Sequence, residues 1–430
     1  MLANNANPDV HLNLNVRGLR PSATLEINEL SARLQAQGRT IYRLGLGQSP
    51  FPVPEPVVEQ LRANAHQKDY LPVRGLPALR DSVAGYYRRR QELERAGDDV
   101  LVGPGSKELM FILQLVYYGD LVIPTPSWVS YAPQAHIVGR HIRWLPTTAE
   151  DGWPMQAGEL DRLCREDPER PRIVILNYPS NPTGQTYRKE QLEELAAVAR
   201  RYRVILVSDE IYGEIDHSGE HVSIARFYPE GTIVSSGLSK WCGAGGWRLG
   251  TFTFPPGLRW LLDAMAVVCS ETFTATSAPI QYAAVRAFEG GLEIERYLFQ
   301  SRRVLRALGR SLAARLRGAG ISAHDPEGAF YVFPDFGPRR ELLAARGITT
   351  SVQLCERLLA DTGVALLPGV SFGRSAEELT ARLAYVDFDG ARALVAARGV
   401  PDAEELDAAF LEIHCHRVTT ATELMCEWLR

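Results

Sequence analysis

The chain has 430 residues, of which 45% are hydrophobic and 23% are charged, and its formal net charge is −4. A chain of this size can bury a large core and is expected to form two domains. The small net charge argues against nucleic acid or a membrane surface as the main partner. The sequence has no run of about 18 uncharged apolar residues, so no transmembrane helix is expected.

Two further features favour a reducing, cytoplasmic location. Residues Met1 to Pro8 lack the charged and apolar blocks of a signal peptide. The six cysteines are dispersed without a Cys-x-x-Cys pair, as expected for free thiols. His414-Cys415-His416 could suggest a metal site, but neighbours on a helix point in different directions, and no metal is expected.

Apolar periodicity divides the chain into helices and strands. The first 20 residues, which carry Asn and Pro, are expected to form a flexible arm. In chain order the helices are expected at 25–34, 109–116, 189–202, 293–317, 404–411 and 420–428, and the strands at 121–124, 172–177, 204–207 and 232–234. The segment 172–207 reads as strand, helix, strand, so its two strands should be parallel and the fold should be α/β.

Lys240 is the most informative single residue. It ends a small-residue segment that begins at Ser235, and Arg248 follows eight positions later. Glycine and serine offer a lysine stem no apolar surface, but their backbone N–H groups and hydroxyls suit a phosphate. An amine beside a phosphate site, with a second cation near it, suits pyridoxal phosphate (PLP) held as a Schiff base. The alternative is an ordinary exposed loop lysine.

Polar residues follow three strands that should end at one sheet edge, where α/β folds place their ligands. Asn181 follows strand 172–177, Asp209 and Tyr212 follow strand 204–207, and the Lys240 segment follows strand 232–234. Asp209 could keep a pyridine nitrogen protonated, Asn181 and Tyr212 could donate hydrogen bonds to a ring oxygen, and Lys240 could move a proton. The structural alternatives are a turn initiator for Asn181, a helix N-cap for Asp209 and a core aromatic for Tyr212.

These residues resemble a known family. Asn181–Gly184, Ser208–Tyr212, Ser239–Lys240 and Gly246–Arg248 are similar to motifs of the class I/II aminotransferases of PLP fold type I. Similar segments lie in the family's order at 69–80, 126–131, 326–331, 367–369 and 382–385. The resemblance implies a large PLP-binding domain at 45–301, with a mostly parallel sheet flanked by helices. It also implies a smaller α+β domain built from 1–44 and 302–430.

The resemblance also implies a role for each matching residue. The catalytic residues would be Lys240, Asp209 and Tyr212, and the same three would bind PLP with Asn181 on the ring oxygen and Trp128 stacked on the ring. The phosphate would be held by Gly105, Ser106, Lys107, Ser239 and Arg248, and by Tyr70 reaching in from a neighbouring subunit of a homodimer. The substrate would contact Arg382, as a bidentate fork on the α-carboxylate, and also Asn181, Gly47, Trp128, Lys107 and Thr24.

Within the family, the bacterial aspartate aminotransferase subgroup is the most similar. Arg20–Thr24 and Gly105–Lys107 look like its segments, which implies that Lys107 and Thr24 bind the side-chain carboxylate of an aspartate- or glutamate-like substrate. Either residue could instead be an ordinary polar residue at a helix start, although a lysine there opposes the helix dipole by roughly 0.3–1 kcal/mol.

Other segments depart from the subgroup. The chain has Gly47-Gln48-Ser49-Pro50-Phe51 where the subgroup has Gly-Glu-Pro-Asp-Phe, and it also differs at Tyr178, Ser180 and 241–245. These changes could reshape the pocket.

The expected activity is PLP-dependent transfer of an amino group between an L-amino acid and a 2-oxo acid by a ping-pong mechanism. Aromatic or sulfur-containing amino acids are alternative substrates. A C–S lyase reaction or closure to a cyclopropane could use the same kind of site. A PLP-sensing regulatory domain fused to a DNA-binding module is disfavoured, because about 20 residues precede the first match and no basic surface is evident.

Overall fold

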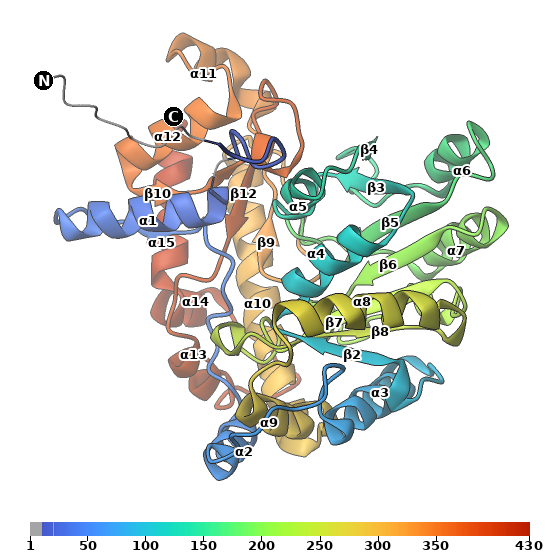
Figure 1. Ribbon diagram of the computed structural model, residues 1–430. Helices are drawn as coiled ribbons and strands as arrows, with labels where there is room; N and C mark the ends of the chain where they lie inside the picture. The colour runs from blue at the N-terminus through green and yellow to red at the C-terminus, as the bar shows by residue number, and fades with distance from the viewer. Residues whose placement is uncertain (1–10, 20) are drawn as a thin grey trace, which may run out of the picture.

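The computed structural model describes residues 11–19 and 21–430 and has the expected α/β architecture (Figure 1). Most of the expected N-terminal arm, and Arg20 of the segment before the first helix, lie outside the described residues. No described helix combines the length and apolar character needed to cross a membrane.

A seven-stranded sheet forms the centre of the larger part of the molecule, with strand order β2-β8-β7-β6-β5-β3-β4. Its strands are β2 (Val100–Gly103), β3 (Asp120–Thr125), β4 (Ile142–Pro146), β5 (Arg172–Asn177), β6 (Ile205–Asp209), β7 (Thr232–Gly237) and β8 (Gly250–Thr253). Strand β8 is antiparallel to both of its neighbours, and the other neighbouring pairs are parallel. The four expected strands and the mostly parallel sheet are therefore confirmed.

Helices cover both faces of this sheet (Figure 1). Ile173 and Ile175 pack in a core on one face, and Val174 and Leu176 pack on the other, as the two-residue period of a strand requires. The first core is completed by α4 (Ser106–Val116), α5 (Tyr131–Ile137) and α8 (Arg259–Thr272), and the other face by α3 (Pro77–Gln91), α6 (Ala157–Arg165), α7 (Lys189–Arg201) and α9 (Ala278–Glu289). Burial on both faces explains why these strands read as unbroken apolar runs.

The long helix α10 (Leu292–Gly318), expected at 293–317, runs along the boundary between this part and a smaller one (Figure 1). The smaller part contains an antiparallel sheet of β11 (Leu367–Pro368), β12 (Ala381–Ala384) and β9 (Tyr331–Val332). Strand β1 (Tyr42–Arg43) pairs in parallel with β10 (Val364–Ala365), which joins the N-terminal segment to the C-terminal part. The division into domains at residues 45 and 301 stays a prediction.

The remaining described helices lie mostly in the N-terminal segment and the C-terminal third. They are α1 (Ala23–Ala36), α2 (Glu55–Asn64), α11 (Arg340–Ala345), α12 (Ser351–Thr362), α13 (Gly390–Ala397), α14 (Ala408–His414) and α15 (His416–Trp428). The helices expected at 25–34, 109–116 and 420–428 are parts of α1, α4 and α15, which begin two to four residues earlier, and the helix expected at 189–202 matches α7 to within one residue.

The helix expected at 404–411 is wrong at its start. Helix α14 begins at Ala408, where the Asp407 carboxylate accepts a hydrogen bond from the Phe410 N–H at 2.8 Å. The segment before α14 is not helical, because the Arg303 guanidinium binds the carbonyl oxygens of Pro401 and Glu404 at 2.9 and 2.7 Å. Helix α14 ends at His414 and α15 begins at His416, so His414-Cys415-His416 lies where the two helices meet.

Candidate active site

A cavity of about 400 Å³ lies beyond the carboxyl ends of β5, β6 and β7, bounded by the last residues of β5 and β6 and by the loop after β7. Eleven of the fourteen residues predicted for the site line it: Thr24, Gly47, Ser106, Lys107, Trp128, Asn181, Asp209, Tyr212, Ser239, Lys240 and Arg248. Gly105 directly precedes Ser106, whereas Arg382 and Tyr70 are not among the lining residues. The fold therefore brings together residues from segments more than two hundred positions apart.

Lys240 presents its amine to the cavity. Its Nζ donates a hydrogen bond to the carbonyl oxygen of Gly47 at 2.7 Å and lies 5.6 Å from the ring centre of Tyr212. Burial lowers the pKa of the Lys240 amine to about 7, and the positive charges of Arg382 and Arg248 add to this effect. About half of the amine is consequently neutral near pH 7, which is the form that reacts with carbonyl carbon.

Asp209 ends strand β6 and is 4% exposed. It accepts hydrogen bonds from the Tyr131 hydroxyl at 2.6 Å and from Ser235 Oγ at 3.3 Å. Burial nevertheless raises the pKa of its carboxyl to about 6. A cation placed against Asp209 would therefore favour the ionised carboxylate and would itself be stabilised.

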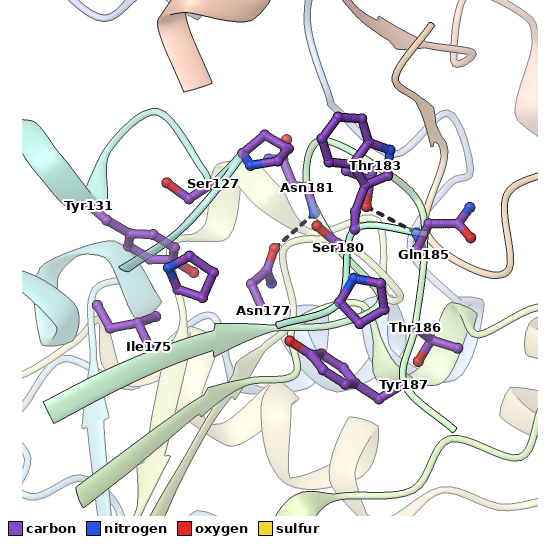
Figure 2. Close-up of a pocket in the computed structure, with 14 residues that line it drawn as sticks. Ser127, Tyr131, Ile175, Asn177, Ser180, Asn181, Thr183, Gln185, Thr186 and Tyr187 are labelled. Carbon is purple, nitrogen blue, oxygen red and sulfur yellow. Dashed lines mark hydrogen bonds between the residues drawn. The ribbon is translucent and has the colours of Figure 1, made fainter. Parts of the chain in front are cut away.

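Asn181 connects the strand ends to Arg382. Its backbone N–H donates to Asn177 Oδ1 at 2.8 Å, as Figure 2 shows, and its own Oδ1 accepts from Arg382 Nη1 at 3.0 Å. Arg382 is 1% exposed, and it also donates from Nη2 to the Gly45 carbonyl. The guanidinium thus adjoins the cavity through Asn181, and its grip on a carboxylate stays a prediction.

Positive charge gathers on one side of the cavity. Gly105, the N-cap of α4, has φ +93°, a backbone conformation that favours glycine, and the Arg248 guanidinium lies against it, since a Cβ there would be 2.3 Å from Arg248 Nη2. Burial lowers the pKa of Lys107, and Arg248 lowers it further, which indicates that the two cations act on the same space. A helix N-terminus with two cations beside it is suited to an anion such as a phosphate.

Trp128 and Thr24 line the cavity from different elements, the β3–α5 loop and the start of α1. Lys107 Nζ lies 5.2 Å from the Trp128 ring centre, and the Trp128 ring meets that of Tyr131 edge-on at 5.2 Å. Thr24 lines the cavity from the start of α1. Tyr70 is 91% exposed on this chain, so its predicted contact with a phosphate depends on a neighbouring subunit.

Several lining or supporting residues were not assigned a role from the sequence: Ser22, Leu25, Tyr131, Asn177 and Tyr331. Tyr131 and Tyr331 fall inside segments that resemble the family, but their hydroxyl partners, Asp209 and Tyr212, are distant in sequence. Asn177 could have been found as the polar residue that ends an apolar strand. Its Nδ2 donates to the Asp209 carbonyl at 2.9 Å and so ties the ends of β5 and β6 together.

Comparison with known proteins identifies the family. The family described as aminotransferase class I and II matches residues 39–393. An aspartate aminotransferase from Bacillus sp. (strain YM-2) is 32% identical over 382 residues, covering 86% of this chain and 93% of that protein. The aspartate/prephenate aminotransferase of Thermus thermophilus is 32% identical over 366 residues, covering 84% of this chain and 91% of that protein.

Solved structures agree with this result. The aspartate aminotransferase from Thermus thermophilus with maleate has a TM-score of 0.83 and 28% identity, covering 97% of this chain and 100% of that one. The aspartate aminotransferase from Rhizobium meliloti has a TM-score of 0.80 and 26% identity, covering 96% of this chain and 99% of that one. The chain belongs to the class I and II aminotransferases and is an aminotransferase.

Proposed function

We propose that this aminotransferase uses PLP, bound in the cavity at Lys240, to transfer the amino group of an acidic L-amino acid to a 2-oxo acid. The observation that carries the proposal is the Lys240 amine, which faces the cavity with a pKa lowered to about 7. Burial of a lysine in a site that also holds Arg382, Arg248 and Lys107 is costly without anions. A phosphate and substrate carboxylates supply the missing negative charge.

The residues fit the cofactor group by group. Gly105, Ser106, Lys107, Ser239 and Arg248 would hold the phosphate, since they combine a helix N-terminus, hydroxyls and two cations. Asp209 would face the ring nitrogen, with Tyr212 and Asn181 on the ring oxygen and Trp128 against the ring. When bound, PLP supplies an electron sink for the negative charge that develops at the substrate Cα.

The chain's own residues then position the substrate and move one proton. Arg382 and Asn181, joined at 3.0 Å, would orient the α-carboxylate, with the backbone at Gly47 beside it. The neutral amine of Lys240 would take the proton from the substrate Cα. It would then give this proton to the carbon atom that lies on the other side of the transferred nitrogen. Its pKa of about 7 is near the optimum for a group that must both accept and release a proton at neutral pH.

The acidic substrate is inferred from Lys107 and Thr24. Both line the cavity, and Lys107 could pair with a side-chain carboxylate as well as with phosphate. Relatives named aspartate aminotransferase support this choice. The name aspartate/prephenate aminotransferase, and apolar lining residues such as Leu25 and Ile211, make aromatic amino acids the alternative to test. The panel of amino acids described below also tests sulfur-containing substrates and a C–S lyase reaction.

We also propose a cytoplasmic homodimer. All six cysteines are free and none is exposed, which suits a reducing compartment. Tyr70 is a large aromatic residue that is 91% exposed, and burial against a second subunit would both cover it and bring it to that subunit's phosphate side. Sedimentation of the purified protein tests the dimer, and Tyr70→Phe should weaken PLP binding without separating the subunits.

Covalent trapping tests the central assignment. The protein mixed with PLP should absorb in the visible, and borohydride should fix the cofactor to the peptide that contains Lys240. Lys240→Ala should lose both signals, whereas the exposed control Lys189→Ala should keep them. Cofactor fixed to Lys240→Ala at the wild-type level would show that the assignment is wrong.

A half-reaction panel tests the substrate. Aspartate and glutamate should discharge the visible band faster than alanine, phenylalanine or cysteine, with the 2-oxo acid as product. Ammonia with pyruvate would instead identify a lyase. Lys107→Ala should raise KM for aspartate about 10-fold or more and change KM for alanine far less. An equal rise in KM for both substrates would show that Lys107 contacts the phosphate and not the substrate side chain.

A further inference from the structure

Tyr331 touches three of the groups to which the proposed function assigns a task. It lies on β9 of the smaller sheet, is 1% exposed, and lines the cavity. Its hydroxyl is 2.8 Å from the hydroxyl of Tyr212, and the Arg382 guanidinium lies 4.8 Å from its ring centre. A Cβ on Gly47 would be 2.0 Å from its hydroxyl oxygen, so the Gly47 backbone packs directly against it.

The proposed chemistry decides which of the two hydroxyls, Tyr331 or Tyr212, donates the hydrogen bond between them. Only one proton can lie between two hydroxyl oxygens, and either residue could supply it. If Tyr212 is to donate its proton to a ring oxygen, it must accept from Tyr331. Tyr331 has no competing acceptor, because its one side-chain hydrogen bond in the described residues is to Tyr212, and Arg382 offers donors only.

We propose that Tyr331 is a positioning residue that acts through Tyr212. Its hydroxyl donates to the Tyr212 oxygen and thereby directs the Tyr212 proton toward the ring oxygen of bound PLP. This inference rests on the proposed function. A donor into Tyr212 also strengthens the hydrogen bond that Tyr212 makes, since hydrogen bonds in a chain polarise one another. The smaller sheet thus contributes to the electronic state of a cofactor whose other partners come from the larger part of the molecule.

Tyr331→Phe removes the hydroxyl and keeps the ring beside Arg382. The readout is the absorbance of the PLP-bound protein followed against pH, which reports the protonation of the bound chromophore. A donated hydrogen bond stabilises the deprotonated chromophore, so its loss should raise the apparent pKa. We expect a rise of about 0.5 unit, or roughly threefold in proton affinity, which is the order expected for one neutral hydrogen bond.

Two further variants show the route of the effect. Tyr212→Phe should raise the same apparent pKa, and adding Tyr331→Phe to it should produce no further change. Tyr385→Phe is the matched control. Tyr385 is a buried tyrosine in the same part of the molecule, its hydroxyl is 3.5 Å from the Ala329 carbonyl, and it does not line the cavity. Its loss should leave the titration unchanged.

The outcomes separate this inference from the function on which it rests. A normal chromophore with an unchanged titration in Tyr331→Phe overturns the inference alone. An equal shift with and without the Tyr212 hydroxyl also overturns it, because Tyr331 would then act by another route. A wild-type protein that forms no chromophore with PLP and is not trapped by borohydride overturns the proposed function, and the inference with it.

Discussion

The amine of Lys240 is held by the backbone carbonyl of Gly47, 2.7 Å from its Nζ, and not by a carboxylate. The carbonyl fixes the position of the amine without supplying a full negative charge. Asp209 does raise the pKa of Lys240, but burial and the cations Arg382, Arg248 and Lys107 lower it more strongly. The site therefore holds the amine in place and keeps it reactive at the same time.

The lowered pKa of Lys240 should be visible in the protein without PLP. Acylation by acetic anhydride requires the neutral amine, so the rate at Lys240 should reach half its maximum near pH 7. Mass spectrometry of peptides at several pH values gives the rate, with the exposed Lys189 as internal reference for reagent strength. Arg382→Leu removes one lowering charge and should move the half-point upward. A half-point above pH 9 in the wild type would contradict the electrostatic argument.

Gly47→Ala should disturb the hydrogen bond between Lys240 and the Gly47 carbonyl by changing the Gly47 side of it. The added Cβ would meet the Tyr331 hydroxyl at 2.0 Å, so the Tyr331 ring or the Gly47 backbone must move. Overpacking of this kind costs about 1–3 kcal/mol of unfolding free energy. Urea denaturation measures the loss, and PLP affinity should fall because the Lys240 partner is displaced. Gly257→Ala is the control, since its Cβ meets nothing within 4 Å, and it should change stability by under about 0.5 kcal/mol.

The residues at the ends of the parallel strands could be placed from the amino-acid pattern. Asp209 ends an apolar strand, Asn181 and Lys240 each follow one, and strand order then brings all three to one cavity. Parallel strands buried on both faces give a strong local signal, and the connection rules leave few alternatives for where they end. The apolar pattern and the connection rules are therefore enough to predict which residues share this sheet edge.

Contacts that depend on the smaller sheet could not be predicted in this way. Strand β9 has two residues, too few to show a periodic pattern, and the Tyr331–Tyr212 contact spans more than a hundred positions. The start of α14 was missed for a related reason. The segment before α14 does not form a helix, because Arg303 on α10 binds its carbonyl oxygens. This tertiary contact overrides the local helical pattern.

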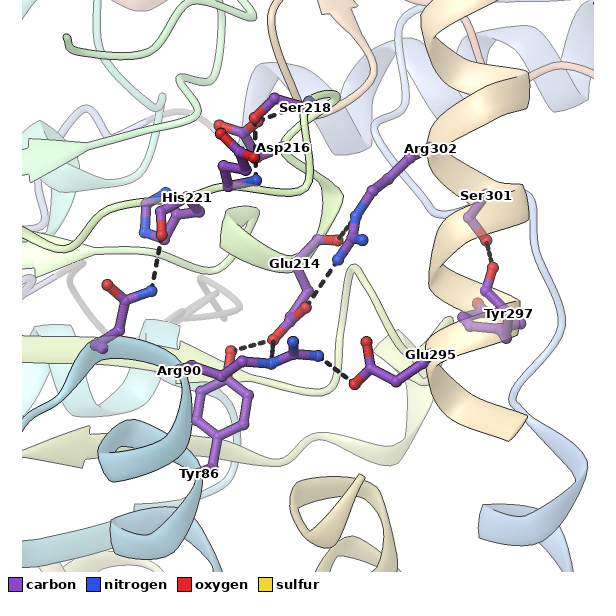
Figure 3. Close-up of polar contacts among 12 residues, drawn as sticks. Tyr86, Arg90, Glu214, Asp216, Ser218, His221, Glu295, Tyr297, Ser301 and Arg302 are labelled. Atoms are coloured by element: carbon purple, nitrogen blue, oxygen red, sulfur yellow. Dashed lines mark hydrogen bonds and ion pairs between the residues drawn. The ribbon is translucent and has the colours of Figure 1, made fainter. Parts of the chain in front are cut away.

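Glu214, two residues after Tyr212, joins three elements through a buried network (Figure 3). It pairs with Arg302 of α10 at 3.0 Å and with Arg90 of α3 at 3.1 Å, and it accepts a hydrogen bond from the Tyr86 hydroxyl at 2.6 Å. The Arg302 and Glu214 side chains are 14% and 8% exposed, so removal of Glu214 leaves the largely buried Arg302 charge without a carboxylate partner, whereas Arg90 keeps Glu295. Glu214→Ala should lower the unfolding free energy by about 3–5 kcal/mol.

An exposed ion pair provides the comparison for Glu214. Arg203 and Glu169 form a salt bridge in which both side chains are more than three-quarters exposed. Glu169→Ala should therefore cost less than about 1 kcal/mol in the same urea denaturation experiment. Equal losses for the two variants would show that the Glu214 network does not act as a buried one.

His221 should make stability depend on pH through a second buried pair. Burial lowers its pKa, but the Glu210 carboxylate, 3.1 Å from its Nε2, raises it more, so the net pKa is above the ordinary value of 6.5. Because the folded pKa is the higher one, the pair's contribution is complete below about pH 6.5 and is lost as pH rises through the folded pKa. The stability difference between wild type and His221→Gln should therefore be larger at pH 6 than at pH 9.

His217 is the matched control, because burial lowers its pKa to about 4. The folded protein keeps His217 neutral, so the effect of His217→Gln should be constant from about pH 7.5 to pH 9. A His221→Gln effect that is equally constant over that range, and no larger at pH 6, would show that the Glu210 pair does not hold a proton.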